Sequence, residues 1–318
     1  MRAENIMKTI VRSQEGSASS LPRLHRSHSC TSSMRRLERV GWTAGISFVS
    51  YGTRFGIRAN NPAVLEGLLE RLPPGWRPAR SPIVEDLYSL FVGGSGSDDR
   101  KGHRRDSHIV LFLQSTRLAR AKDADAVLEF LEHSLHFNVA VKARRHLFVH
   151  AGVVGWHDRA IVVPGRSMSG KTTLIEALVK AGAVYYSDEY AVLDMHGRVH
   201  PYPKPLSLRG EAEGKRRRVP VESLGGRRGA SPLSVGLVAV TRYETGAHWR
   251  PTRLSPGQAV LELLNHTLLA RSRPQLALET LQQTLAGGAM VLKGKRGEAG
   301  ETARWLLDFL DARHGTSP

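Results

Sequence analysis

Cysteine is nearly absent from this sequence: the 318 residues include one, Cys30. A single thiol excludes an internal disulfide framework, a zinc site built from cysteines and an iron–sulfur cluster. No run approaches the roughly 18 consecutive apolar residues that a membrane helix needs. Residues 1–33 also lack the apolar core of a signal peptide. These absences predict a protein without a membrane segment, working in a reducing cytoplasm.

Acidic residues are the second scarcity. Asp and Glu number 29 against 46 Lys and Arg, which gives a formal net charge of +17. Such an excess favours acidic or phosphorylated partners, and it leaves nucleic acid open as a non-specific partner. The basic segments lack the interleaved aromatic side chains that stack on bases, so specific recognition of nucleic acid is not expected. The sequence leaves open whether the chain forms a homo-oligomer.

The first 40 residues differ in composition from the rest. They are rich in Ser and Arg and poor in aliphatic residues, which predicts a disordered basic tail. This tail is either an arm that touches a partner or the result of a start codon assigned too early. In the second and simpler interpretation, translation begins at Met34.

Residues 41–143 show the alternation of a small α/β domain. A hairpin is expected from strands at 46–51 and 54–58, and Asn61-Pro62 should begin a helix that ends near Leu72. The remaining predicted elements are strands at 83–92 and 108–114, joined by a polar loop, and a helix at 123–143. No catalytic constellation is evident in this domain.

Residues 144–318 form the second predicted domain. Its expected strands are 147–154, 159–163, 183–187, 191–194, 198–200 and 234–243. Its expected helices are 172–181, 256–270, 274–286 and 301–312. Between them, residues 210–232 contain six Lys or Arg residues and several glycines, which predicts a mobile basic loop that helps hold an acidic or phosphorylated partner.

The strongest motif is a phosphate-binding loop. It is the segment Gly165-Arg166-Ser167-Met168-Ser169-Gly170-Lys171-Thr172-Thr173, which fits G-x-x-x-x-G-K-[ST]. The glycines let backbone N–H groups turn toward phosphate, and Lys171 can reach the outer phosphates. The Thr172 hydroxyl can ligate Mg²⁺. Because a predicted strand enters the loop and a predicted helix leaves it, we expect ATP and Mg²⁺ as ligands.

Other candidate residues flank this loop. Asp188 and Glu189 end the next predicted strand, where one carboxylate could accept a proton and the other could support the metal. An acidic strand-to-turn connection is the simpler alternative. His150 lies in an apolar strand, a setting more typical of a core histidine than of a catalyst. Lys204 and Arg209 could neutralise phosphoryl charge or could belong to a solvated basic strand.

With these elements in this order, the chain resembles the HPr serine kinase/phosphorylase family, and more nearly its HPr-kinase-like relatives. The resemblance rests on His150-Ala151-Gly152, the GRSMSGKT loop, Ser187-Asp188-Glu189 and Arg209-Gly210. It implies a nucleotide domain with the fold of phosphoenolpyruvate carboxykinase. It also implies that Asp188 is the general base, Glu189 supports Mg²⁺, His150 orients near the phosphates and Arg209 stabilises the transferring group.

Two features depart from the family pattern. The second acidic residue is Glu189 where the family usually has aspartate, and EAEGKRRR follows Arg209-Gly210 in place of an apolar continuation. The second departure argues against HPr itself as the substrate. The sequence therefore predicts an ATP-dependent kinase that acts on a hydroxyl, in particular a serine of a peptide or protein, including a ribosomal precursor peptide. The alternatives are a small-metabolite kinase and a non-catalytic ATP-binding regulatory protein.

Overall fold

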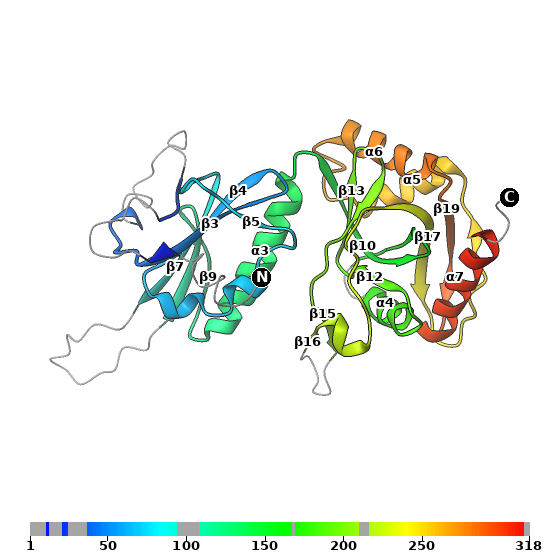
Figure 1. The fold of residues 1–318 in the computed structure, drawn as a ribbon, viewed down its shortest axis with the longest axis horizontal. Coiled ribbons are helices and arrows are strands. Elements are labelled where there is room, and N and C mark those ends of the chain that lie inside the picture. The colour runs from blue at the N-terminus through cyan, green and yellow to red at the C-terminus, as the bar shows by residue number, and fades with distance from the viewer. Residues whose placement is uncertain are drawn as a thin grey trace. The chain divides into compact units, whose positions relative to one another are not determined.

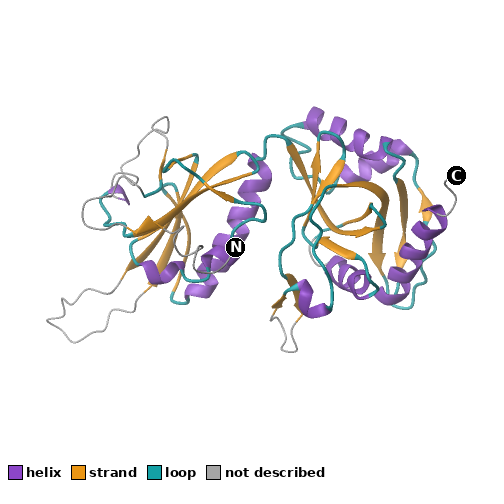
Figure 2. Cartoon of the chain, viewed as in Figure 1, coloured by secondary structure: helices purple, strands orange, loops and turns teal. Residues whose placement is uncertain are grey.

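The computed structural model describes residues 11–12, 21–24, 37–93, 108–166, 169–209 and 216–314. They form helices and several sheets in two compact units, Met1–Arg144 and Arg145–Pro318, so the predicted α/β class is confirmed (Figures 1 and 2). The division lies beside the domain boundary expected from the sequence. Among the described residues, no helix has the length and apolar character needed to cross a membrane.

The first unit is built on a seven-stranded sheet with the order β1-β3-β4-β7-β8-β9, and β5 pairs with β3. Its strands are β1 (Val11–Arg12), β2 (Arg23–Leu24), β3 (Ala44–Ser50), β4 (Thr53–Ala59), β5 (Arg77–Pro78), β6 (Ile83–Val84), β7 (Asp86–Gly93), β8 (His108–Leu113) and β9 (Thr116–Ala121). Its helices are η2 (Pro62–Leu65), η3 (Leu68–Arg71) and α3 (Ala124–Lys142). The predicted hairpin (β3–β4) and the long helix (α3) are confirmed.

Two expectations for this unit are wrong. The helix predicted to begin at Asn61 is two short 3₁₀ helices, because Gly67 between them has a left-handed backbone with φ of 71°. The first 40 residues are not wholly a separate tail, because β1 pairs with β3 and β2 pairs with β6. Glycines of the β3–β4 hairpin let the N-terminal segment pack closely against it, since a Cβ at Gly56 would lie 2.6 Å from the side chain of Pro22. Strand β9 was not expected. The predicted polar loop between the strands at 83–92 and 108–114 lies outside the described residues.

The second unit contains an eight-stranded sheet and a two-stranded hairpin, β15–β16. Its strands are β10 (His146–Trp156), β11 (Arg159–Pro164), β12 (Val184–Ser187), β13 (Tyr190–Asp194), β14 (Arg198–His200), β15 (Leu206–Arg209), β16 (Arg216–Val219), β17 (Leu233–Tyr243), β18 (Thr252–Arg253) and β19 (Met290–Arg296). Its helices are α4 (Lys171–Lys180), η4 (Val221–Leu224), α5 (Pro256–Leu264), α6 (Pro274–Ala286) and α7 (Ala299–His314).

The order of the large sheet is β11-β10-β13-β14-β17-β19-β18. Because β17 also pairs with β11, the path of strands closes on itself. Strand β17 runs parallel to both β11 and β19, so the carboxyl ends of these three strands meet at one edge. Helices α4 and α7 pack side by side through Leu178, Leu306 and other buried residues, and α5 and α6 lie on the other side of the sheet (Figure 1).

Two expectations for this unit are also wrong. The basic segment 210–232 is not one mobile loop: β16 and η4 are ordered, and Tyr185 N–H donates to the Arg227 carbonyl at 2.8 Å. Its glycines permit close packing, since a Cβ at Gly229 would lie 2.2 Å from the ring of Tyr186. The helix expected at 256–270 ends at Leu264, after which the chain pairs with β10. Strand β19 was not expected.

The turn between β10 and β11 stores backbone strain. His157 and Asp158 adopt φ of 40° and 47°, a left-handed conformation that favours glycine. We expect Asp158→Gly to stabilise the protein by about 0.5–1 kcal/mol, measured by chemical denaturation. Asp158→Ala removes the same carboxylate but keeps the Cβ, so it should give no such gain. Equal stability changes in the two variants would contradict this account.

Candidate functional site

The predicted phosphate loop joins β11 to α4 at the edge where β11, β17 and β19 end together. Gly165 N–H donates to the His150 carbonyl at 3.1 Å, which fixes the start of the loop to β10. At the other end, Gly170 takes a left-handed conformation with φ of 83° and precedes α4. Among the described residues, no side chain caps the first N–H groups of this helix. This end of α4 therefore presents free donors and the positive end of its dipole to an anion.

Lys171 folds back over the loop. Its Nζ donates to the carbonyls of Gly165 and Arg166, both at 2.7 Å, and the side chain is buried. Burial lowers the pKa of Lys171, while the carboxylates of Asp188 and Glu189 act in the opposite direction. An ammonium with three N–H donors has one left after these two bonds.

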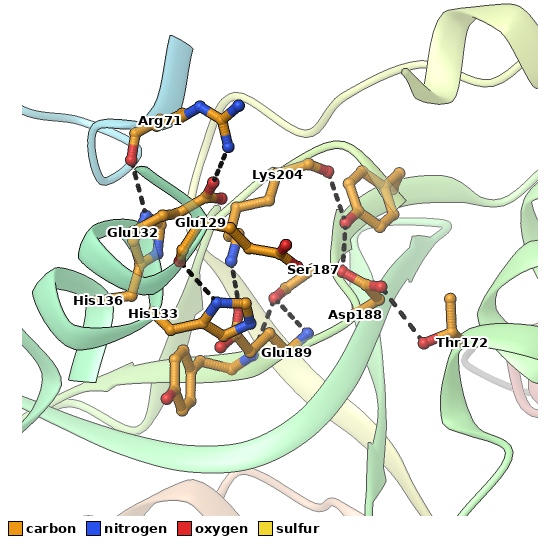
Figure 3. Close-up of polar contacts among 12 residues, drawn as sticks. Arg71, Glu129, Glu132, His133, His136, Thr172, Ser187, Asp188, Glu189 and Lys204 are labelled. Atoms are coloured by element: carbon orange, nitrogen blue, oxygen red, sulfur yellow. Dashed lines mark hydrogen bonds and ion pairs between the residues drawn. The ribbon is translucent and has the colours of Figure 1, made fainter. Parts of the chain in front are cut away.

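Asp188 leaves β12 and turns toward the start of α4. Its Oδ2 accepts a hydrogen bond from the Thr172 hydroxyl at 3.3 Å, and the Tyr185 hydroxyl lies 2.9 Å from its Oδ1 (Figure 3). The Ser207 backbone N–H also donates to it. Burial raises the pKa of Asp188 and Glu189 adds to this effect, while Tyr185, Lys204 and Ser207 lower it. The net result is a carboxylate of raised pKa beside the loop.

Glu189 points away from its neighbour and binds Lys204, whose Nζ lies 2.5 Å from Glu189 Oε2 (Figure 3). The Ser187 hydroxyl shapes this corner, because it accepts the N–H groups of Glu189 at 3.1 Å and Tyr190 at 3.0 Å. Adjacent carboxylates thus have different partners. Asp188 faces the hydroxyl of the loop threonine, and Glu189 faces a cation.

His150 lies on β10 beside the loop. Its ring is 4.9 Å from the ring of Tyr190. Burial lowers its pKa and Lys171 adds to this, while Glu189 acts in the opposite direction. The imidazole is therefore neutral near pH 7 and can serve as a hydrogen-bond donor or acceptor, but not as a fixed positive charge.

Not every predicted residue can be placed at this site. Ser167 and Met168 lie outside the described residues, and Arg209 is placed by its backbone pairing with Arg216 in the β15–β16 hairpin. Arg166 and Thr173 are exposed. The residues that the structure gathers are Gly165, Ser169, Gly170, Lys171, Thr172, Asp188, Glu189 and His150.

Arg296 was missed by the sequence analysis. It ends β19, is 2% exposed, and its Nη2 donates to the Gly170 carbonyl at 2.9 Å. Its Nη1 donates to the Gly297 carbonyl at 2.9 Å, and its guanidinium lies over the ring of Tyr243. Burial lowers the pKa of Arg296, which Tyr243 and Glu298 partly oppose. A cation buried against carbonyl groups at the loop makes this region favourable for an anion.

Tyr185 is the second missed residue. It is fully buried, and its hydroxyl lies 2.9 Å from both Asp188 Oδ1 and the Lys204 carbonyl. A tyrosine at the end of an apolar strand gives no signal that its hydroxyl will meet a carboxylate three residues later. Its contacts orient the carboxylate that the sequence had proposed as a base.

The donor set gives partial support for a magnesium ion. Thr172 and Asp188 place a hydroxyl and a carboxylate oxygen together, which are ligand types that Mg²⁺ prefers. Glu189 is held by Lys204, and no cluster of three or more His, Cys, Asp or Glu suited to a metal occurs among the described residues. A bound ion would therefore depend on the nucleotide phosphates for much of its coordination.

Comparison with known proteins adds no assignment. No protein-family model matches the chain, and a search of the curated proteins finds no match. Any function proposed for the chain therefore rests on the geometry of the site.

Proposed function

We propose that the second unit is an ATP-dependent kinase of the cytoplasm, with the fold and mechanism of the HPr-kinase-like family. It transfers the γ-phosphoryl group to a hydroxyl, and its acceptor is a serine of a peptide or protein. The observation that carries this proposal is the Asp188–Thr172 contact of 3.3 Å, which puts a carboxylate next to the Lys171 loop. A phosphate loop by itself only binds nucleotide, whereas a carboxylate next to it can also act as the base in phosphoryl transfer to a hydroxyl.

Each residue has a role in this mechanism. The loop N–H groups and the remaining Lys171 donor bind the phosphates, and Asp188 accepts the proton of the acceptor hydroxyl as its oxygen attacks phosphorus. Thr172, with Glu189 as support, would hold Mg²⁺, which neutralises phosphate charge when bound. In that role, Glu189 would support the metal while it keeps its ion pair with Lys204. The His150 side chain is oriented toward the phosphates, and Arg209 stabilises the phosphoryl group as it is transferred.

The basic hairpin β15–β16 supports an acidic polypeptide as acceptor. Ser207, whose N–H reaches Asp188, pairs across this hairpin with Arg218, and the neighbouring Arg217 is exposed. A positive surface attached to the proposed base attracts acidic residues around the acceptor serine. A small metabolite would not need such a surface.

An ATP-binding regulatory protein is the second candidate. Lys204 neutralises Glu189 at 2.5 Å, an arrangement that removes one carboxylate from metal binding and suits a sensor of nucleotide.

Incubation of the purified chain with γ-labelled Mg-ATP distinguishes the kinase from the sensor. The kinase should label a peptide in which glutamates flank a serine. It should not label the same peptide when alanine replaces that serine. Tight ATP binding with no transfer to this peptide, to a basic serine peptide or to small hydroxylated metabolites favours the sensor.

Arg296 provides a prediction about the loop itself. Removing its bond to Gly170 should loosen the turn that precedes α4, so we expect Arg296→Met to weaken Mg-ATP affinity about tenfold in calorimetry. Arg304→Met on the exposed face of α7 is the matched control and should bind like the parent. Parent-like affinity in a folded Arg296→Met protein would show that the bond to Gly170 does not shape the loop.

A further inference from the structure

The segment after α5 is bonded to the same residue as the phosphate loop. His150 N–H donates to the His266 carbonyl at 2.7 Å, and the His150 carbonyl accepts from Gly165 N–H at 3.1 Å. Leu268 N–H adds a bond to the Phe148 carbonyl at 3.1 Å, and Thr267 bridges Val149. The backbone of His150 thus fixes His266 and the start of the loop next to each other.

The side chain of His266 has an unused donor or acceptor. Its Nδ1 is buried and has no hydrogen-bond partner among the described residues. The carboxylate that influences it, Glu262, is already paired with Lys293 at 2.7 Å. A histidine that served packing alone would be expected to satisfy this nitrogen, because an unpaired buried polar atom costs free energy.

Two of the groups that act on His266, Lys171 and Arg166, belong to the loop. Burial lowers its pKa; Glu262 opposes this, while Lys171, Arg166 and His150 lower the pKa further. The ring is therefore neutral near pH 7 and can carry its proton on Nδ1. Its neighbours are the lysine that reaches the outer phosphates and the histidine beside the acidic pair. A phosphate oxygen between these groups would satisfy the unpaired nitrogen.

We propose that His266 binds the terminal phosphoryl group of ATP, donating a hydrogen bond from Nδ1 to a γ-phosphate oxygen. The inference rests on the proposed function, because it requires ATP in the loop. It adds a second imidazole to the site, at the edge of β10 opposite to the edge that pairs with β12. It assigns this imidazole to the γ-phosphate, which is present in ATP and absent from ADP.

The test compares Mg-ATP with Mg-ADP in calorimetry, without acceptor. His266→Leu should lose about tenfold in affinity for Mg-ATP, the size of one hydrogen bond to a charged group, and stay within twofold for Mg-ADP. His266→Asn places an amide near the position of Nδ1 and should recover most of the affinity. His196→Leu, at an exposed histidine of the same unit, is the matched control and should bind both nucleotides like the parent.

Two results would overturn the proposal: parent-like Mg-ATP affinity in His266→Leu, or an equal loss for Mg-ATP and Mg-ADP. Equal loss would assign His266 to the shape of the loop. If His266→Leu does not fold, His266→Gln takes its place, because its amide reaches the position of Nε2 and not that of Nδ1: a loss confined to Mg-ATP supports the proposal, and parent-like affinity or a loss as large for Mg-ADP contradicts it. A parent protein that binds neither nucleotide would instead refute the proposed function.

Discussion

Replacing Asp188 with asparagine is expected to lower phosphoryl transfer by about a hundredfold or more, the usual size of a general-base contribution. Asparagine has almost the same shape. Its oxygen can accept from Tyr185 in place of Oδ1, and its NH2 group can donate to the Thr172 hydroxyl, so the local structure should persist. It cannot take up a proton at neutral pH. Mg-ATP affinity should therefore stay within a few fold of the parent. Transfer is measured with γ-labelled ATP, and affinity by calorimetry.

The pH dependence of the parent gives an independent check on this role. Burial raises the pKa of Asp188 and the partly opposing hydrogen bonds do not cancel this, so the carboxylate becomes protonated at a higher pH than an ordinary aspartate. A protonated carboxyl cannot act as the base. Transfer should therefore fall, as pH is lowered, at a pH above the ordinary aspartate range, and this acidic limb should be missing from the residual activity of Asp188→Asn.

Glu189→Gln is the matched variant at the neighbouring residue. Because its proposed role is to support the metal, it should raise the Mg²⁺ concentration needed for transfer more than it lowers the maximal rate. If Glu189→Gln abolished transfer while Asp188→Asn changed only the Mg²⁺ requirement, the two roles would be exchanged. Parent-like transfer in both variants would remove the acidic pair from the mechanism.

The central part of the site was predictable because its signals are local. The loop from Gly165 to Thr172, the strand before it and the helix after it are encoded in one continuous segment, and the strand and the helix occur as expected. The separation of Asp188 from Glu189 also follows from local geometry, since adjacent side chains leaving a strand point in different directions. Their partners, Thr172 and Lys204, lie 16 and 15 residues away in sequence.

The missed residues depend on contacts that no short pattern contains. Arg296 meets Gly170 across 126 residues, and it does so because β19 aligns in parallel with β17. His266 was hidden in a predicted helix that ends two residues earlier, at Leu264, because the following backbone bonds to β10 instead. Apolar spacing favours a longer helix there, and tertiary hydrogen bonds override it.

Glycine explains the other errors. The helix expected from Asn61 is interrupted at Gly67, and the basic segment near Gly229 is held in place by a contact only glycine allows. Glycine in a polar segment is typical of a mobile loop, yet it equally permits close packing. Sequence alone does not distinguish these uses, because the packing partner, here Tyr186, lies far away in the chain.

Lys171→Ala is expected to weaken Mg-ATP binding by about tenfold to a hundredfold, as hydrogen bonds to charged groups contribute about 1.5–3 kcal/mol. The ammonium is already desolvated and is held by the carbonyls of Gly165 and Arg166, so little further ordering is needed when it meets a phosphate. Its loss removes the positive charge that Asp188 and Glu189 favour, and it leaves the negative field of these two carboxylates to repel the phosphates. Calorimetry with Mg-ATP and Mg-ADP measures the effect.

The matched control for this variant lies on the same helix. Lys180 ends α4, its side chain is 56% exposed, and it pairs with Glu176 one turn earlier. Lys180→Ala removes an equal charge far from the loop and should leave nucleotide affinity unchanged, which separates local binding from the general effect of net charge. Lys171→Ala should lose affinity for both nucleotides, in contrast to His266→Leu, because the lysine reaches phosphates that ATP and ADP share. Parent-like affinity in Lys171→Ala would show that the segment is not a phosphate-binding loop, and the kinase and sensor proposals would fail together.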